Sequence, residues 1–233
     1  MFIGTIVNCL TILFGGIIGL FFSKVPENFK NSIMISISLV VIYIGLDMVS
    51  EVESIVLLMI SLVSGTVIGE LLKIDDHLNK CIEWIIRKIN IASHDTKVNI
   101  AFINATLFFV VGAMSIIGAL DSGIRGNHDV LMIKGMMDGI IALIFATTMG
   151  IGVIFSIIPL FLFQGALILL ATQIDQYVPI ELLNDIIVSI TSVGGIMILG
   201  IGLNLLNVTN IKISNLLPSI VTGILITYIA WYI

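Results

Sequence analysis

Long apolar stretches dominate the pattern of residues along the chain. A membrane-spanning helix needs roughly 20 apolar residues, because in lipid the backbone must satisfy its hydrogen bonds within the helix. The stretches that meet this requirement lie near 2–22, 33–50, 54–72, 100–120, 133–155, 158–174, 186–206 and 214–233. The apolar run 133–174 is too long for one span, and Ile157-Ile158-Pro159 marks the predicted break. The pattern predicts an all-α, polytopic transmembrane helical bundle of about eight spans.

The segment between the third and fourth predicted spans has a different pattern. In residues 71–91, apolar positions recur every three or four residues and charged side chains fill the opposite face. This spacing is typical of an amphipathic helix, and Trp84 with its basic neighbours suits the headgroup boundary of a membrane. The alternative is a helix that packs against the protein's own loops.

The composition excludes a soluble globule. Of the 233 residues, 58% are hydrophobic and 11% are charged, and the mean hydropathy is +1.20. A soluble domain carries about 25% charged residues, so we expect the lipid bilayer as the surroundings of this chain. The net charge of −5 argues against a nucleic-acid partner, which demands clustered Lys and Arg.

The two cysteines, Cys9 and Cys81, lack metal-ligand spacing and are expected to be free thiols. Residues 1–22 are expected to be a retained first span.

Basic residues are concentrated on one set of loops. The odd-numbered loops hold Lys24, Lys30, Lys73, Lys80, Arg87, Lys88, Lys97 and Lys212, and loop four holds Arg125 and Lys134. The positive-inside rule therefore places the odd loops in the cytoplasm and both termini outside. The outer face is acidic near loops two and six, with Asp47, Glu51, Glu53, Asp175, Glu181 and Asp185.

The chain contains a candidate internal repeat. Val25-Pro26, followed by Asn31, Ile33, Ser36, Ile37 and Ser38, matches Val178-Pro179, followed by Asn184, Ile186, Ser189, Ile190 and Thr191, at an offset of 153. Further along, Ile44-Gly45-Leu46-Asp47 resembles Ile201-Gly202-Leu203-Asn204 at an offset of 157. Spans one to three would then match spans six to eight, and an odd offset in spans inverts the second copy across the bilayer. Chance is the alternative, since apolar helices align easily.

The repeat divides one membrane domain, residues 1–233, into four segments. These are a first repeat (1–73), an amphipathic helix with its linker (74–98), a central hairpin (99–156) and a second repeat (157–233). Inverted repeats give many secondary transporters two alternately open states around one central site, although a channel can be built in the same way.

Polar residues within the spans are the candidate site residues. Asp138 in span five is the clearest, because a carboxylate in the membrane costs several kcal/mol and needs a reason to be there. It could bind a cation, relay a proton or simply pair with Lys134, four residues away on the same helix face. Asp121 lies at the outer end of span four. Uncharged candidates for a solute pathway, or for interhelical hydrogen bonds of about 1 kcal/mol or less, are Asn8, Asn104, Gln164 and Asn204.

The sequence carries no enzyme signature. HExxH, GxSxG, P-loop and dinucleotide-binding motifs are missing, and His77, His94 and His128 lie in predicted loops without ligand spacing. We therefore predict no catalytic residue, no metal site and no cofactor, and we expect that the protein is not an enzyme.

Several short motifs together resemble one bacterial family. They are IGTIVN at the start, VGAM in span four, MDG in span five, and VGG with ILGIGLNLL near the end. The whole chain resembles the YdfK/YqgA-like integral membrane proteins of unknown function, with one departure at Asp121-Ser122-Gly123, where an acidic residue followed directly by Gly is expected. The resemblance implies a multi-pass protein of the bacterial cytoplasmic (inner) membrane, with seven or eight spans. It implies no substrate and no functional residues.

The leading hypothesis is a secondary transporter of a small solute across that membrane. Asp138 would be its principal charged group, supported by Asp121 and by Asn204 or Gln164, and the acidic outer face favours a cation, an amine or a proton-coupled solute. The alternatives are an ion or solute channel, or a membrane scaffold that docks a cytoplasmic partner on 71–91. The identity of the substrate and a homo-oligomeric state stay open.

Overall fold

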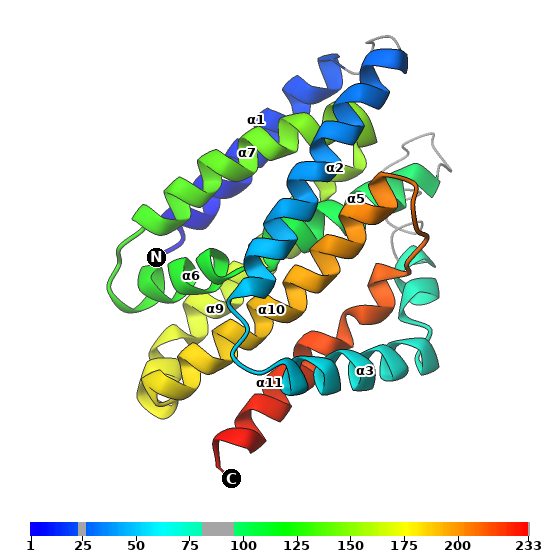
Figure 1. Cartoon of the computed structure of the whole chain (residues 1–233). Helices are drawn as coiled ribbons and strands as arrows, with labels where there is room; N and C mark the ends of the chain where they lie inside the picture. Colours follow the sequence, from blue (N-terminus) through cyan, green and yellow to red (C-terminus); the bar gives the residue numbers. More distant parts are fainter. Residues whose placement is uncertain (23–26, 81–95, 233) are drawn as a thin grey trace. The chain divides into compact units, whose positions relative to one another are not determined.

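The computed structural model describes residues 1–22, 27–80 and 96–232, and within these ranges every regular element is a helix (Figure 1). The elements are α1 (Ile3–Phe21), α2 (Glu27–Ser50), α3 (Ile55–Leu71), α5 (Thr96–Val110), α6 (Ala113–Ile124), α7 (Asp129–Met149), α8 (Gly152–Phe155), α9 (Ile157–Tyr177), α10 (Ile180–Leu205), the 3-10 helix η2 (Ile213–Leu216) and α11 (Pro218–Trp231). The predicted all-α class is confirmed.

The helices are long and apolar enough to cross a bilayer several times. Six candidate spans lie within the described residues, and two further helix pairs, each bent at a short break, raise the number to as many as eight. This agrees with the predicted helical bundle of about eight spans. The described part of the predicted amphipathic segment contains a helix over Ile74–Lys80, bent by 56° from α3. Residues 81–91 of that segment, and Val25-Pro26 of the repeat, lie outside the described residues.

The fourth predicted span is not one straight helix. The sequence predicts a continuous span near 100–120, but α5 ends at Val110, α6 begins at Ala113, and the two are bent by 58°. Gly112 between them has φ 144° and ψ 146°, a conformation that side chains with a Cβ rarely adopt. The predicted span near 100–120 is therefore present as a bent helix pair, and Gly112 acts as the helix break within it.

The break in the apolar run 133–174 begins earlier than predicted. Helix α7 ends at Met149, before Gly150 with its φ of 85°, and the short α8 leads into α9 at Ile157. Pro159 lies in the first turn of α9, where its missing N–H has no intrahelical partner to lose. The glycine breaks the helix, and the proline is accommodated at the start of the next one.

The chain separates into two compact units, which we describe individually. Unit 1 contains Met1–Met34 and Ile100–Leu183, and unit 2 contains Ile35–Asn99 and Asn184–Ile233. The segmentation into repeats, linker and hairpin stays a prediction.

Unit 1 contains two parallel helix pairs. Residues of α1 from Asn8 to Gly19 lie against residues of α7 from Gly135 to Thr147 in the same order, so these two helices run side by side in one direction (Figure 1). In α6 and α9, Ser115 lies beside Gln164 and Gly123 lies beside Ala171, which is again a parallel arrangement.

Two antiparallel pairs form the interior of unit 2. In α3 and α11, Thr222 donates a hydrogen bond to the Ser61 carbonyl, and Gly65 lies against Ser219, so the residue order reverses. In α2 and α10, Gly45 lies against Gly195 and Leu199. The contacts at Gly65 and Gly45 depend on the glycine, because a Cβ there would meet backbone atoms of the partner helix.

The polarity of the helices is that of a protein in lipid. In α1 the buried positions are mostly small or polar, including Thr5, Asn8 and Gly15, whereas Phe14 is 62% exposed. In α7, Gly135 and Asp138 are buried and Ile140 is 64% exposed. Small residues inside and large apolar residues outside suit a bilayer, where helix packing rather than exclusion from water drives association.

Candidate functional site

A buried ion pair lies on α7. Lys134 and Asp138 are one turn apart on the helix, and they are 7% and 3% exposed. The Lys134 Nζ donates to Asp138 Oδ2 at 2.5 Å. The predicted i,i+4 pairing is therefore present, and it lies inside unit 1 rather than at a solvated surface.

Glycines on α7 bring a third polar group to this pair. Gly135 and Gly139 have no Cβ, so the backbone of α1 packs closely against them at Asn8 and Thr11. At this separation Asn8 Nδ2 donates to Asp138 Oδ2 at 3.1 Å. We call Asn8, Lys134 and Asp138 the Asp138 cluster.

The cluster also holds an acceptor that is not used. The Asn8 Oδ1 atom is buried without a hydrogen-bond partner in the described part of the chain, and so is the Thr5 Oγ1 atom one turn earlier on α1. A buried polar atom without a partner costs about 1–3 kcal/mol, so such atoms are often completed by water, an ion or a ligand. The arrangement can bind a cation or proton at the carboxylate, in competition with Lys134, and can accept an N–H or O–H at Asn8.

Two other predicted site residues are buried in unit 1 but form separate contacts. Gln164 Nε2 donates to Ser115 Oγ at 3.0 Å, and the Gln164 Oε1 atom is buried without a partner among the described residues. Asn104 is buried on α5. No described hydrogen bond joins Gln164 or Asn104 to the Asp138 cluster.

Asp121 and Asn204 have local partners. Asp121, near the end of α6, lies 3.6 Å from the Arg125 guanidinium, which is 79% exposed. Asn204, near the end of α10, accepts from the Thr209 hydroxyl and the Ile211 N–H, and donates to the Ile211 carbonyl. These bonds hold the chain that follows α10. Of the predicted site residues, the structure brings together Asn8 and Asp138.

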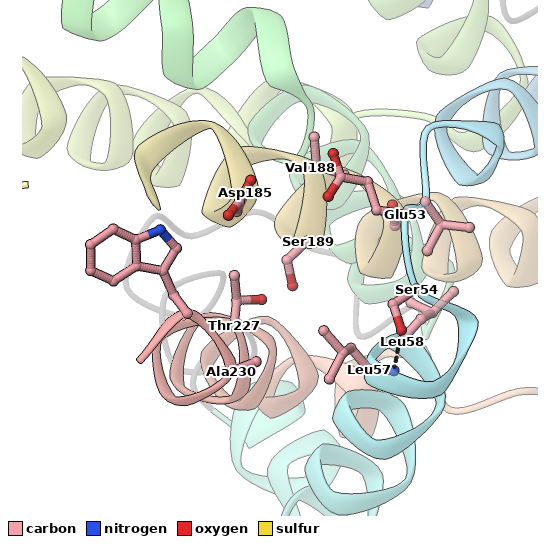
Figure 2. Close-up of a pocket in the computed structure, with 12 residues that line it drawn as sticks. Glu53, Ser54, Leu57, Leu58, Asp185, Val188, Ser189, Thr227 and Ala230 are labelled. Atoms are coloured by element: carbon pink, nitrogen blue, oxygen red, sulfur yellow. Dashed lines mark hydrogen bonds between the residues drawn. The ribbon is translucent and has the colours of Figure 1, made fainter. Parts of the chain in front are cut away.

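Unit 2 contains a second polar feature, which the sequence analysis did not predict. A cavity of about 310 Å³, which we call the α10–α11 cavity, lies among the start of α3, the loop before it, α10 and α11 (Figure 2). Its polar lining consists of Glu53, Ser54, Asp185, Ser189, Ser192, Thr227 and Trp231. The available signal was a polar stripe on α10, since Asp185, Ser189 and Ser192 are spaced by four and three residues and share a helix face. Glu53 and Asp185 alone suggested only an acidic outer face.

The helices and their buried polar groups define an integral membrane protein with several helical spans. The chain belongs to the DUF554 family, described as a protein of unknown function, which matches residues 3–228. This confirms the resemblance inferred from the motifs.

Two bacterial relatives cover almost the whole chain. An uncharacterized membrane protein of Bacillus subtilis (strain 168), YdfK, is 30% identical over 222 residues, which cover 93% of this chain and 92% of the relative. An uncharacterized protein of Escherichia coli (strain K12), YqgA, is 25% identical over 241 aligned positions, which cover both chains completely. No solved structure matches the chain.

Proposed function

We propose that the protein is a secondary transporter of a small cationic, amine-bearing or proton-coupled solute, with the Asp138 cluster as its charged centre. The observation that carries this proposal is the Lys134–Asp138 pair, buried inside a candidate span and bonded to Asn8 of a neighbouring helix.

The cost of charge in lipid gives the pair its significance. An ionised side chain in the hydrocarbon region costs several kcal/mol, and such residues commonly mark ion or proton pathways. A proton or cation that binds Asp138 competes with Lys134 for the same carboxylate oxygen, since both present donors use Oδ2. Occupancy of the site would therefore change the position of Lys134 and the contact between α1 and α7.

The packing within unit 2 supports the inverted repeat that alternating access requires. A Cβ at Gly45 would meet the Leu199 nitrogen and the Gly195 oxygen. A Cβ at Gly202 would meet the Ile42 nitrogen and the Ser38 oxygen. Adding 157 to Ser38, Ile42 and Gly45 gives Gly195, Leu199 and Gly202, so each helix makes the same contact with the other. The same offset of 157 relates Ile44–Asp47 to Ile201–Asn204. Reciprocal packing of this kind is expected from two inverted copies.

The parallel pairs in unit 1 fit the same scheme. In the predicted repeat, α1 and α9 are the first helices of the two copies. Helix α1 runs parallel to α7 and α9 runs parallel to α6, so each first helix packs on one arm of the central hairpin.

The test is uptake by purified protein in liposomes. The probes are radiolabelled rubidium, methylammonium, 1,4-diaminobutane, choline and amino acids, each with and without an imposed pH gradient. We expect saturable uptake of at least one probe. At equal amounts of folded, reconstituted protein, uptake should fall about tenfold or more in Asp138→Asn, because the charged centre is lost. The matched control is Asp129→Asn, which removes an exposed carboxylate from the first turn of the same helix, and uptake should persist.

Two outcomes contradict the proposal. Uptake that is unchanged in Asp138→Asn removes the Asp138 cluster from the mechanism. Single-channel currents in planar bilayers favour the channel, because a carrier cycle is too slow to produce them. If the protein is instead a scaffold, Asp138→Asn should have no effect on its function. Charge reversal at Lys80, Arg87 and Lys88 should disrupt binding of a cytoplasmic partner.

A further inference from the structure

The α10–α11 cavity carries negative charge that no described cation neutralises. Glu53 and Asp185 are among its lining residues, and the lining contains no Lys, Arg or His. Within the described residues neither carboxylate has an ion-pair partner. The loop 51–54 and the segment 175–185 also contain no basic residue, so the surrounding chain adds no compensating charge. Such a cavity attracts a cation.

A buried hydroxyl in the lining has no described partner. Ser192 is 1% exposed, and its Oγ atom has no hydrogen-bond partner in the described part of the chain. Figure 2 shows the hydroxyl groups of Ser189 and Thr227 pointing into the space between α10 and α11. Hydroxyl and carboxylate oxygens can all accept hydrogen bonds, so together they suit a ligand with several N–H or O–H donors.

The rest of the lining is apolar or aromatic. Leu57, Leu58 and Val188 contribute alkyl surface, and Trp231 contributes an indole ring. An ammonium ion is attracted to the face of an indole, and a short alkyl chain gains by leaving water for an apolar wall. A fully hydrated inorganic cation would gain nothing from this part of the cavity.

We infer that the α10–α11 cavity binds a primary alkylammonium ion, with Asp185 and Glu53 opposite its charge and the hydroxyl groups of Ser189, Ser192 and Thr227 accepting its N–H donors. The inference rests on the proposed transport function only in taking this ion as the transported solute. A quaternary ammonium lacks N–H donors and would leave the hydroxyl groups unbonded. A divalent metal ion demands more ligands, and the described residues contain no group of three or more His, Cys, Asp or Glu placed to hold one.

Binding can be followed through the tryptophan in the cavity. The chain has two tryptophans, so Trp84→Phe leaves Trp231 as the reporter in otherwise complete, detergent-purified protein. Titration with 1,4-diaminobutane at constant ionic strength should give a saturable change in fluorescence. Tetramethylammonium chloride and magnesium chloride should give none in the same concentration range.

Substitutions locate the site. Asp185→Asn should weaken binding of 1,4-diaminobutane by about tenfold or more, because a hydrogen bond to a charged carboxylate is stronger than one to a neutral amide. Asp175→Asn is the matched control, because Asp175 is an exposed carboxylate that does not line the cavity, and it should leave binding unchanged. Ser192→Ala should weaken binding without lowering the melting temperature of the ligand-free protein, because it removes a hydroxyl that has no described partner.

Any of three results would overturn the inference. They are the absence of saturable 1,4-diaminobutane binding, equally tight binding of tetramethylammonium or magnesium, and unweakened binding in both Asp185→Asn and Ser192→Ala. The assay does not depend on a transport cycle. Binding at the cavity with no uptake into liposomes contradicts the proposed function alone. Asp138-dependent uptake with no binding at the cavity contradicts this inference alone.

Discussion

At the scale of single residues, the Lys134–Asp138 pair can serve either stability or transport, and the two roles make different demands. A buried pair that serves only stability is replaceable by neutral side chains of similar size, often without loss. A pair that serves transport is not replaceable. Asn8 adds a second donor to the same carboxylate oxygen, which stabilises the charged form of Asp138 in the absence of solute.

A double-mutant cycle separates the contribution of the pair from that of its members. Lys134→Met or Asp138→Asn alone should destabilise the protein by about 3–5 kcal/mol, because each leaves an uncompensated buried charge. The double variant should cost less than either single one. Unfolding in a mixed detergent and denaturant titration measures the three values.

The Asp121–Arg125 pair supplies the control for this cycle. It has the same i,i+4 spacing, but the Arg125 side chain is 79% exposed, so the removal of Arg125 should cost about 0–1 kcal/mol. If the double variant loses as much stability as the two single variants together, the Lys134 and Asp138 side chains do not interact.

The sequence predicted some of these contacts because they are local. Lys134 and Asp138 share a helix face, so their spacing along one helix was enough. The bond from Asn8 joins residues 130 positions apart and depends on close packing at Gly135, which a spacing rule does not contain. The partners of Asn204 depend on how the chain turns after α10. The cavity was missed because its lining comes from three helices and a loop.

At the scale of helices, glycines decide where the elements break and where they meet. Gly112 and Gly150 hold backbone conformations with positive φ and end helices that the apolar pattern alone would continue. A hydropathy profile does not detect such a break. Glycine allows a backbone conformation that ends the helix, but it hardly lowers the mean hydropathy of the region. The prediction of about eight spans agrees with the six to eight candidate spans of the described residues, but it did not locate the breaks at these two positions.

The contact between α1 and α7 can be tested with one methyl group. Gly15→Ala would place a Cβ against the Gly139 carbonyl oxygen, a backbone atom that cannot rotate away. We expect a loss of about 1–3 kcal/mol from overpacking, and a lower melting temperature in detergent. Uptake should fall with it, since Asn8 lies on the same helix.

Gly165→Ala is the matched variant for this test. A Cβ at Gly165 would meet only the Phe2 ring, at 3.6 Å, which is an ordinary contact. Alanine also favours the helix by about 1 kcal/mol over glycine, so the stability should be unchanged or raised. Equal destabilisation by the two substitutions would mean that the α1–α7 contact is not close.

At the scale of the whole molecule, the protein is a member of a family of unknown function, and the proposed mechanism is that of a carrier. The family and the helical spans establish a membrane protein. The reciprocal glycine contacts in unit 2 favour the proposed inverted repeat, which would give a carrier two alternately open states. The orientation with both termini outside stays a prediction from the distribution of basic residues.

The most direct test of alternating access is an exchange measurement. Liposomes that contain the purified protein are loaded with the radiolabelled probe that shows the highest uptake, and efflux is followed with and without the unlabelled probe outside. A carrier returns faster with solute bound, so we predict that external unlabelled probe accelerates efflux and that Asp138→Asn abolishes the acceleration. Efflux that is indifferent to external probe would contradict a carrier and favour a channel.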